Sequence, residues 1–458
     1  MLVKKTNNNL TNTIPQGLPG FTLYTAGLIT LALMLPPVIF DPASKQFILI
    51  VGTLALWRYS WGLLHFIRHW IYRKIVFPKI RKAIDKNTDA LMPGHIYLLV
   101  TSFRIETDTT IKVFKSVISE AINCGTPATI VASIVERGDE ILIKSLFESA
   151  SPPKSVKLII VRIPGSGKRD GLAQGFRAIS RDMPPADAVA AVIDGDSILE
   201  PGLVRKCAPL FKLDPKIGAL TTDELCEVRG SIVMRQWHHL RFIQRHITMC
   251  SIALSRQVLT LTGRMSMFRA SILTDPDFID QVQNDSVTHW RLGHFRFLTG
   301  DDKSSWYWIL KKSWNMLYIP DAVVTTIEHP PDPNFFKAST QLMFRWFGNM
   351  LRTNGRALML NPLKIGLFPW WCILDQRLSM WTSLTGPVFA LLLSAANGTA
   401  ILPVFILWIG FTRWVMTLML FSARGSLNWL YPFLIYYNQI WGACIKTYVF
   451  FRLDQQSW

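Results

Sequence analysis

The stretch Ala-Val-Ala-Ala-Val-Ile-Asp-Gly-Asp, residues 188–196, is an uncharged apolar run that ends in two acids two positions apart. Such a run is typical of a strand buried on both faces of a parallel sheet, and ligands bind at the carboxyl ends of such strands. At this spacing, Asp194 and Asp196 can face one side and hold Mg²⁺ or Mn²⁺ against the phosphates of a nucleotide ligand. Asp-Gly-Asp is also ordinary turn chemistry, so the spacing alone supports both interpretations equally.

Short β-branched runs and amphipathic segments alternate on both sides of this stretch. The runs cover residues 96–100, 129–135, 156–162, 189–193 and 217–221, and the amphipathic segments cover 109–124 and 170–181. This alternation predicts parallel βαβ units with helices on both faces of one sheet. We therefore expect an α/β domain over residues 92–330.

The composition places this domain in a membrane protein. The 458 residues carry a net charge of +18, half of them are hydrophobic and only 17% are charged. Disordered chains are poorer in apolar residues, so that class is excluded. Apolar runs of spanning length predict two membrane helices within residues 1–76 and three within 377–458, and basic residues place the end of the second one in the cytoplasm. The candidate spans are 21–40, 47–67, 378–393, 401–421 and 427–451.

Charged residues inside or beside these spans have two interpretations. Arg58 and Arg413 lie within candidate spans, where such groups either face protein or line a path for an anion. Residues 331–376 mix basic and aromatic side chains, which predicts amphipathic helices at the membrane surface. There, Arg345 and Trp346 either hold a pyrophosphate and stack on a sugar ring or anchor the helix in the membrane, and anchoring is the commoner role.

Two further motifs carry groups suited to catalysis or phosphate binding. Asp301 and Asp302 follow an apolar stretch, and one of them is suited to act as a general base on an acceptor hydroxyl. The alternative is a helix N-terminus, where Asp is favoured. The basic turn at 165–171 contains Lys168 and Arg169 but lacks the Gly and the Ser or Thr that a phosphate loop requires. It is compatible only with phosphate binding at a helix N-terminus.

In this order, the motifs resemble those of the processive, membrane-embedded family 2 glycosyltransferases, which include the cellulose, chitin and hyaluronan synthases. The matching motifs are D-x-D at 194–196, the acidic pair at 301–302, R-W at 345–346 and the basic G-K-R turn at 167–169. The Gln of the family's Q-x-x-R-W pattern is absent, because Leu342 occupies its position and Gln341 lies one residue early. Residues 262–269 resemble the family's S-G-P-L-G-M-Y-R segment, with Arg264 in place of Pro.

Nearly the whole chain is similar to one branch of this family, the bacterial mannuronan synthases that polymerise alginate. The similar stretches include residues 100–105, 300–306 and 449–454. The resemblance implies a GT-A domain flanked by transmembrane helices, inverting transfer from GDP-mannuronate into β-1,4-linked polymannuronate, and a divalent metal, Mg²⁺ or Mn²⁺. It assigns metal binding to Asp194 and Asp196, and the general base to Asp302 with support from Asp301.

The same resemblance implies substrate contacts, location and partners. It places Lys168 and Arg169 at the donor, Glu136 at the nucleotide, and Arg345 and Trp346 where diphosphate and acceptor sugar meet. It implies a multi-pass protein of the bacterial inner membrane with a cytosolic catalytic domain. The implied partners are membrane lipids, the growing polymannuronate chain, a PilZ-domain copolymerase that binds cyclic di-GMP and the envelope alginate secretion complex, with no nucleic acid.

Two alternatives stay open at this point. The chain is a synthase of another polysaccharide from a UDP-sugar, or it is a non-catalytic membrane scaffold of a polysaccharide secretion complex. Different nucleotide sugars distinguish the first alternative. The joint presence of Asp194, Asp196 and Asp302 argues against the second.

Overall fold

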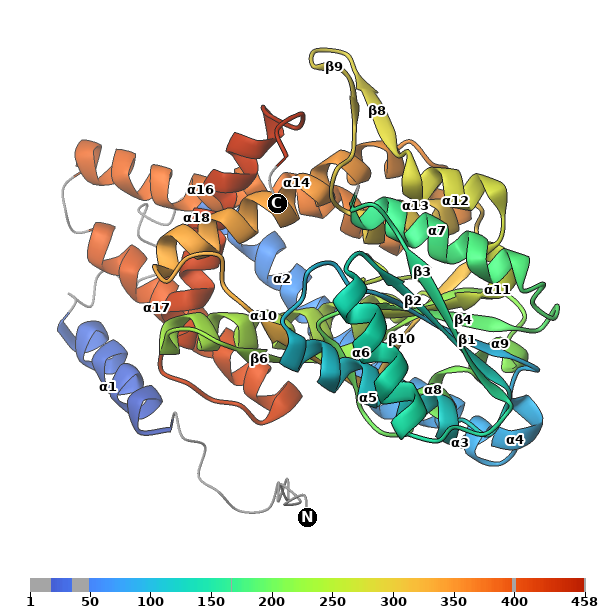
Figure 1. The fold of residues 1–458 in the computed structure, drawn as a ribbon. Coiled ribbons are helices and arrows are strands. Elements are labelled where there is room, and N and C mark those ends of the chain that lie inside the picture. The colour runs from blue at the N-terminus through green and yellow to red at the C-terminus, as the bar shows by residue number, and fades with distance from the viewer. Residues whose placement is uncertain (1–17, 35–48, 166, 398–400, 457–458) are drawn as a thin grey trace. The chain divides into compact units, whose positions relative to one another are not determined.

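The computed structural model describes residues 18–34, 49–165, 167–397 and 401–456 (Figure 1). These residues divide into two compact units, which we describe separately. The larger unit comprises Trp61–Met380 and Cys444–Trp458, and the smaller unit comprises Met1–Ser60 and Trp381–Ala443.

An eight-stranded sheet forms the centre of the larger unit, in the order β3-β2-β1-β4-β7-β6-β10-β5. Its strands are β1 (Ile96–Thr101), β2 (Ala128–Ile134), β3 (Val156–Arg162), β4 (Val189–Asp194), β5 (Ser197–Leu199), β6 (Ile217–Val228), β7 (Met265–Arg269) and β10 (Asn315–Glu328). A separate hairpin consists of β8 (Ser286–His289) and β9 (Gly293–Arg296). Each predicted run corresponds to a strand, with the run 129–135 extending one residue past β2, and the α/β class is confirmed.

Strands β1 to β4 are parallel and in register at their carboxyl ends. Thr101 of β1 pairs with Ser133 of β2 on one side and with Asp194 of β4 on the other. All residues of β1 and β2 are buried, which agrees with their uncharged sequences, in which the polar side chains are hydroxyls. The register brings the polar residues that follow these strands to one edge of the sheet.

The other half of the sheet is mixed, beyond the parallel βαβ units that the sequence predicts. Strand β7 lies between β4 and β6 and runs antiparallel to both, and β5 runs antiparallel to β10. Strand β6 extends to Val228, well past the predicted run at 217–221, through the buried acids Asp223 and Glu224. These acids interrupt the apolar pattern, but each has polar partners. The Tyr318 hydroxyl donates to Asp223, and Glu224 pairs with two arginines that are described below.

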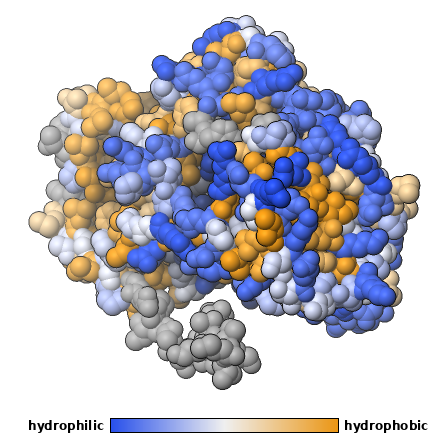
Figure 2. Space-filling view, viewed as in Figure 1, coloured by the Kyte–Doolittle hydropathy of each residue, from blue (hydrophilic) through white to orange (hydrophobic). Residues whose placement is uncertain are grey.

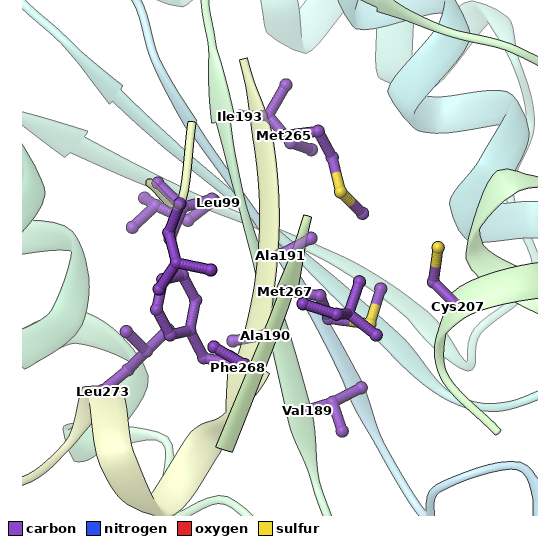
Figure 3. Close-up of a cluster of buried hydrophobic side chains, with 14 of the residues drawn as sticks. Leu99, Val189, Ala190, Ala191, Ile193, Cys207, Met265, Met267, Phe268 and Leu273 are labelled. Atoms are coloured by element: carbon purple, nitrogen blue, oxygen red, sulfur yellow. The ribbon is translucent and has the colours of Figure 1, made fainter. Parts of the chain in front are cut away.

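Helices cover both faces of the sheet, as predicted (Figure 1). Figure 3 shows that Leu99, Phe268 and Leu273 lie on one side of β4 and β7, whereas Met267 and Cys207 lie on the other. The helices of this unit are η2 (a π-helix, Tyr72–Val76), α3 (Phe77–Asp85), α4 (Thr88–Leu91), α5 (Thr107–Asn123), α6 (Arg137–Ser149), α7 (Lys168–Arg181), α8 (Leu203–Cys207), α9 (Leu210–Leu213), α10 (Ile232–Ala253), α11 (Ala270–Leu273), α12 (Pro276–Gln283), α13 (Asp301–Lys311), α14 (Phe335–Ala357) and α15 (Pro362–Ile365).

The remaining helices are long and apolar. They are α1 (Leu18–Met34), α2 (Leu49–Ile71), α16 (Leu367–Asn397), α17 (Ile401–Arg424) and α18 (Tyr431–Phe450). Among the described residues, two helical stretches are long and apolar enough to cross a membrane, Leu367–Ala396 and Ile401–Arg424. Leu391, Ile406 and Phe411 of these helices are exposed. Figure 2 shows hydrophobic (orange) surface on one face of the molecule. Residues 35–40 and 47–48 of the predicted spans lie outside the described residues, and the five-span topology stays a prediction.

Within the smaller unit, α1, α17 and α18 are joined by polar side chains. The indole nitrogen of Trp414 donates to Thr25, and the Tyr24 hydroxyl donates to the Gly410 carbonyl. The buried Arg413 donates to the side chain of Gln439. Arg413 therefore faces protein, which is one of the two alternatives left open by the sequence.

Candidate active site

The two acids of the D-x-D motif follow β4 at the carboxyl edge of the sheet. Asp194 is the last residue of the strand and Asp196 precedes β5. Between them, a Cβ atom on Gly195 would lie 2.9 Å from both the Thr101 carbonyl oxygen and the Ser102 Cα. Because backbone cannot move aside as a flexible side chain can, only glycine fits here. Close packing of β4 against the end of β1 thus fixes the direction of both acids.

We expect Gly195→Ala to lower the free energy of unfolding by about 1–3 kcal/mol, because the new methyl group overpacks against the backbone at the end of β1. A thermal shift of the purified protein measures this change. Gly138→Ala is the matched control, since a Cβ on Gly138 meets nothing within 4 Å. Equal unfolding temperatures for the two variants would show that the contact at Gly195 relaxes freely.

Lys168 links the D-x-D motif to the second acidic pair. Its Nζ lies 2.6 Å from Asp194 Oδ1 and 3.2 Å from Asp301 Oδ2. Burial lowers the pKa of Lys168, but the two carboxylates raise it by more, so the ammonium group stays charged. Gly263 allows this close approach, since a Cβ there would lie 2.7 Å from Asp194 Oδ2 and 2.9 Å from Lys168 Nζ. The ammonium group therefore compensates one acid of each pair.

The adjacent acids Asp301 and Asp302 differ in environment. Both lie in the first turn of α13. Gly300 is the N-cap residue of this helix and has a φ of +80°. Burial, together with the charge of Asp301, raises the pKa of Asp302, whose Oδ2 accepts a hydrogen bond from Thr260 at 3.1 Å. Although burial opposes it, Lys168 lowers the pKa of Asp301. Neighbouring carboxyls whose pKa values are pushed apart are typical of acid–base sites.

Asp196 is a buried acid in a strongly negative neighbourhood. Burial, followed by the charges of Asp194 and Glu328, raises the pKa of Asp196 to about 7, and Arg264 opposes this effect. Two carboxylates that resist joint ionisation in this way form a donor set suited to a divalent cation, which prefers oxygen ligands. The residues present therefore fit the metal that the sequence motif implies.

The structure corrects the prediction that Arg169 contacts the donor. Its side chain is buried and donates to the carbonyls of Val282 and Thr299, at 2.6 and 2.8 Å, and to the Ser304 hydroxyl at 3.1 Å. These contacts hold the segment that leads into Asp301. Arg169 thus acts on the site by positioning the acidic pair, because its place in the first turn of α7 directs it inward and not toward the sheet edge.

Glu136 lies at the same sheet edge but faces solvent. It precedes α6, directly after β2, and its carboxylate is 3.4 Å from Arg104 Nε. Arg104 follows β1 and has a φ of +52°. Both side chains are exposed, so the nucleotide contact predicted for Glu136 stays a prediction.

Arg345 and Trp346 lie on α14, where the tryptophan packs against α10. The rings of Trp346 and Trp237 stack at 5.7 Å with an angle of 18°, and the Arg241 guanidinium lies 4.2 Å from the Trp346 ring centroid. This packing supports a position inside the protein, not the membrane-anchor alternative. Three residues further along α14, Asn349 accepts a hydrogen bond from Thr299 at 2.7 Å. One helix thus contacts both the aromatic pair and the segment before Asp301.

The sequence analysis missed a buried ionic network beside Asp196. Arg264 donates to Glu224 at 3.0 Å and to Glu328, and Arg245 lies 3.1 Å from the other oxygen of Glu224. The Arg264 side chain therefore compensates acids from two neighbouring strands, β6 and β10. The one sequence signal was that Arg264 replaces the Pro of the family pattern.

A mixed sheet with paired acids at its carboxyl edge and a second acidic pair nearby is the arrangement expected of a glycosyltransferase of the GT-A type. A model of the family described as "glycosyltransferase like family 2" matches residues 93–349. Glycosyltransferase alg8 of Pseudomonas syringae pv. tomato is 54% identical over 439 residues, which is 96% of this chain and 89% of that protein. Glycosyltransferase alg8 of Azotobacter vinelandii is 52% identical with the same coverage. The chain belongs to glycosyltransferase family 2 and, within it, to the Alg8 glycosyltransferases.

A solved structure has the same fold. The mannosyltransferase PcManGT from Pyrobaculum calidifontis, in complex with GDP-Man and Mn²⁺, is similar with a TM-score of 0.52 and 15% sequence identity. The similarity covers 82% of this chain and 96% of that one. At this level of identity the comparison supports the GT-A fold alone.

Proposed function

We propose that this protein polymerises mannuronate from GDP-mannuronate into β-1,4-linked polymannuronate, the precursor of alginate, and passes the product across the bacterial inner membrane. The observation that carries the proposal is the identity of 52–54% to Alg8 glycosyltransferases over nearly the whole chain. A net charge of +18 agrees with it, since the donor and the polymer are both anions that a basic protein attracts.

The reaction that we propose is a single inverting displacement. Asp302 accepts the proton of the acceptor hydroxyl, and the freed oxygen electron pair forms a bond to C1 of the donor sugar. The bond between C1 and the diphosphate oxygen breaks, and GDP leaves with that electron pair. The raised pKa of Asp302 makes its carboxylate a stronger base than an exposed aspartate.

The other residues bind and orient the reactants. Asp194 and Asp196 would hold a divalent cation, Mg²⁺ or Mn²⁺. When bound, the cation neutralises negative charge on the leaving diphosphate. Lys168 contributes a second positive charge on the same side, 2.6 Å from Asp194 Oδ1. Asp301 holds Lys168, and Arg345 and Trp346 bind the acceptor beside the diphosphate.

The proposed setting is the inner membrane, with the sheet-bearing unit in the cytoplasm. The apolar helices Leu367–Ala396 and Ile401–Arg424 support membrane association. We propose membrane lipids, a PilZ-domain copolymerase that binds cyclic di-GMP and the envelope secretion complex as partners, by analogy with the mannuronan synthases. No nucleic acid is involved.

A membrane assay tests the proposed function. Membranes that contain the full chain, its PilZ-domain partner and cyclic di-GMP receive GDP-mannuronate, UDP-glucose or UDP-N-acetylglucosamine, and nucleotide release and polymer are measured. We expect polymer from GDP-mannuronate only, and none after EDTA treatment. Polymer from a UDP-sugar would show that the donor is that UDP-sugar and not GDP-mannuronate. The absence of turnover with every donor would favour the scaffold alternative.

Cation binding should depend on pH through Asp196. Its pKa of about 7 refers to the protein without metal, so protons compete with the cation below that pH. We expect the affinity for Mn²⁺ to be constant above about pH 8 and to fall by up to about tenfold per pH unit below pH 7. Titration of Mn²⁺ by its electron paramagnetic resonance signal measures this. An affinity that is flat from pH 5 to 8 would contradict the assignment of Asp196 as a ligand.

A further inference from the structure

A half-buried guanidinium without a carboxylate partner lies beside the predicted acceptor position. Arg241, on α10, lies 4.2 Å from the ring centroid of Trp346 and 5.0 Å from that of Trp237. Among the described residues, no carboxylate is within ion-pair distance of Arg241. Aromatic faces stabilise a cation only modestly, so this contact leaves most of the cost of burying the charge uncompensated.

The nearest acids are already engaged by other arginines. Glu328 accepts from Arg264, and Glu224 is held between Arg264 and Arg245. Burial, and then the charge of Arg264, lowers the pKa of Arg241 to about 10, so the group remains protonated at neutral pH. The ion pairs of Glu224 and Glu328 among the described residues thus involve Arg245 and Arg264 and do not include Arg241.

Helix α14 contacts both Arg241 and the segment that leads into the acidic pair. Trp346, which Arg241 contacts, lies one turn before Asn349, and Asn349 accepts from Thr299 in the segment that leads to Asp302. The charges of Glu328 and Arg264 also change the pKa of Arg241, so these groups lie near it. The charge of Asp196 likewise raises the pKa of Arg264. Arg241 is therefore on the acceptor side of the site, between the aromatic pair and the ionic network.

We propose that Arg241, lying across Trp237 and Trp346, forms a subsite for the carboxylate of a uronic acid residue in the acceptor chain. The partly exposed indole of Trp346, backed by the buried Trp237, offers an apolar surface to the sugar, and the guanidinium fork matches a carboxylate in two parallel hydrogen bonds. This inference rests on the proposed function and deepens it. It assigns selectivity for acidic over neutral acceptors to a residue outside the family motifs.

Acceptor binding by an Arg241→Gln variant of the full chain tests the proposal. The dissociation constants of GDP, of a β-1,4-mannuronate oligomer and of a neutral β-1,4-mannose oligomer are measured on the purified protein. We expect about tenfold weaker binding of the mannuronate oligomer, because one charge-assisted interaction is lost. Binding of GDP and of the neutral oligomer should change by less than about twofold.

Two further variants separate charge, geometry and folding. Arg241→Lys keeps the positive charge but loses the planar guanidinium. The affinity of this variant for the mannuronate oligomer should therefore lie between that of Arg241→Gln and that of the unmodified chain. Arg235→Gln is the matched control, because Arg235 is exposed near the start of the same helix. Unchanged GDP binding and unfolding temperature show that each variant is folded.

The outcomes that overturn the proposal are distinct from a failure of the proposed function. Equal weakening of both oligomers would make Arg241 a structural partner of the tryptophans, and weakened GDP binding would assign the cation to the donor diphosphate. Polymannuronate synthesis by the unmodified chain, together with an unchanged acceptor preference in Arg241→Gln, would refute this inference alone. Synthesis of only a neutral polymer by the unmodified chain would refute both.

Discussion

Asp302→Asn is expected to lower polymer synthesis by a factor of about 10² to 10⁴, because an amide cannot accept the proton of the acceptor hydroxyl. The change is nearly isosteric, and the hydrogen bond from Thr260 can still be accepted by the amide oxygen. GDP release from GDP-mannuronate in membranes measures the rate, and the affinity for GDP should be unchanged. The effect therefore falls on the chemical step and not on donor binding.

Asp280→Asn provides the control for Asp302→Asn. Asp280 is exposed on α12 and bonds only locally to Asn284 in the described structure. Its replacement removes the same charge from the chain, and its activity should equal that of the unmodified protein. If Asp302→Asn retains full synthesis, another group accepts the proton and Asp302 is not the base.

Asp194→Ala is expected to reduce synthesis by about 10³-fold, because an absent ligand removes several kcal/mol of charge stabilisation from the departing diphosphate. The variant also leaves Lys168 with Asp301 as its only carboxylate within 4 Å among the described residues. Mn²⁺ binding should weaken in parallel with activity, which distinguishes a lost ligand from a lost fold. The unfolding temperature and the intact binding of neutral oligomers provide the check on folding.

A different result for Asp194→Ala would assign Asp194 another role. Unchanged Mn²⁺ affinity with lost activity would mean that Asp194 acts only by holding Lys168. In that case Lys168→Met should reproduce the loss, and the cation would be bound elsewhere. Asp280→Asn again serves as the control for a non-specific loss of negative charge.

The sequence was sufficient for the parallel half of the sheet and for the acids at its edge. The runs that became β1 and β2 carry no charge and are buried throughout, and the run that became β4 is apolar up to Asp194, so these runs identify the strands of this half. Asp194 and Asp196 follow from the end of one such run. The family motifs placed Lys168 at the donor, and the contact of Lys168 with Asp194 is seen only in the structure.

The antiparallel half of the sheet and the buried arginines depend on long-range contacts that no local sequence pattern reveals. Strand β7 is short and has few β-branched residues, so its position between β4 and β6 arises from long-range pairing. Glu224 and Glu328 look like surface acids until Arg264 is brought to both of them. Arg169 was misassigned because a basic turn says nothing about which of its side chains points inward. Arg241 went unnoticed because its partners are two tryptophans.

The loop at residues 260–264 touches three parts of the site at once. Thr260 contacts Asp302, Gly263 lies against Asp194 and Lys168, and Arg264 joins the acids beside the acceptor. We therefore expect Thr260 variants to change the rate and Arg264 variants to change the charges beside the acceptor, so that a rearrangement of the whole loop would alter both. Helix α10 contacts the acceptor side but neither acidic pair among the interactions described above. Divergence toward a new polymer is accordingly easier through α10 than through the loop, and related synthases should differ in sugar chiefly along that helix.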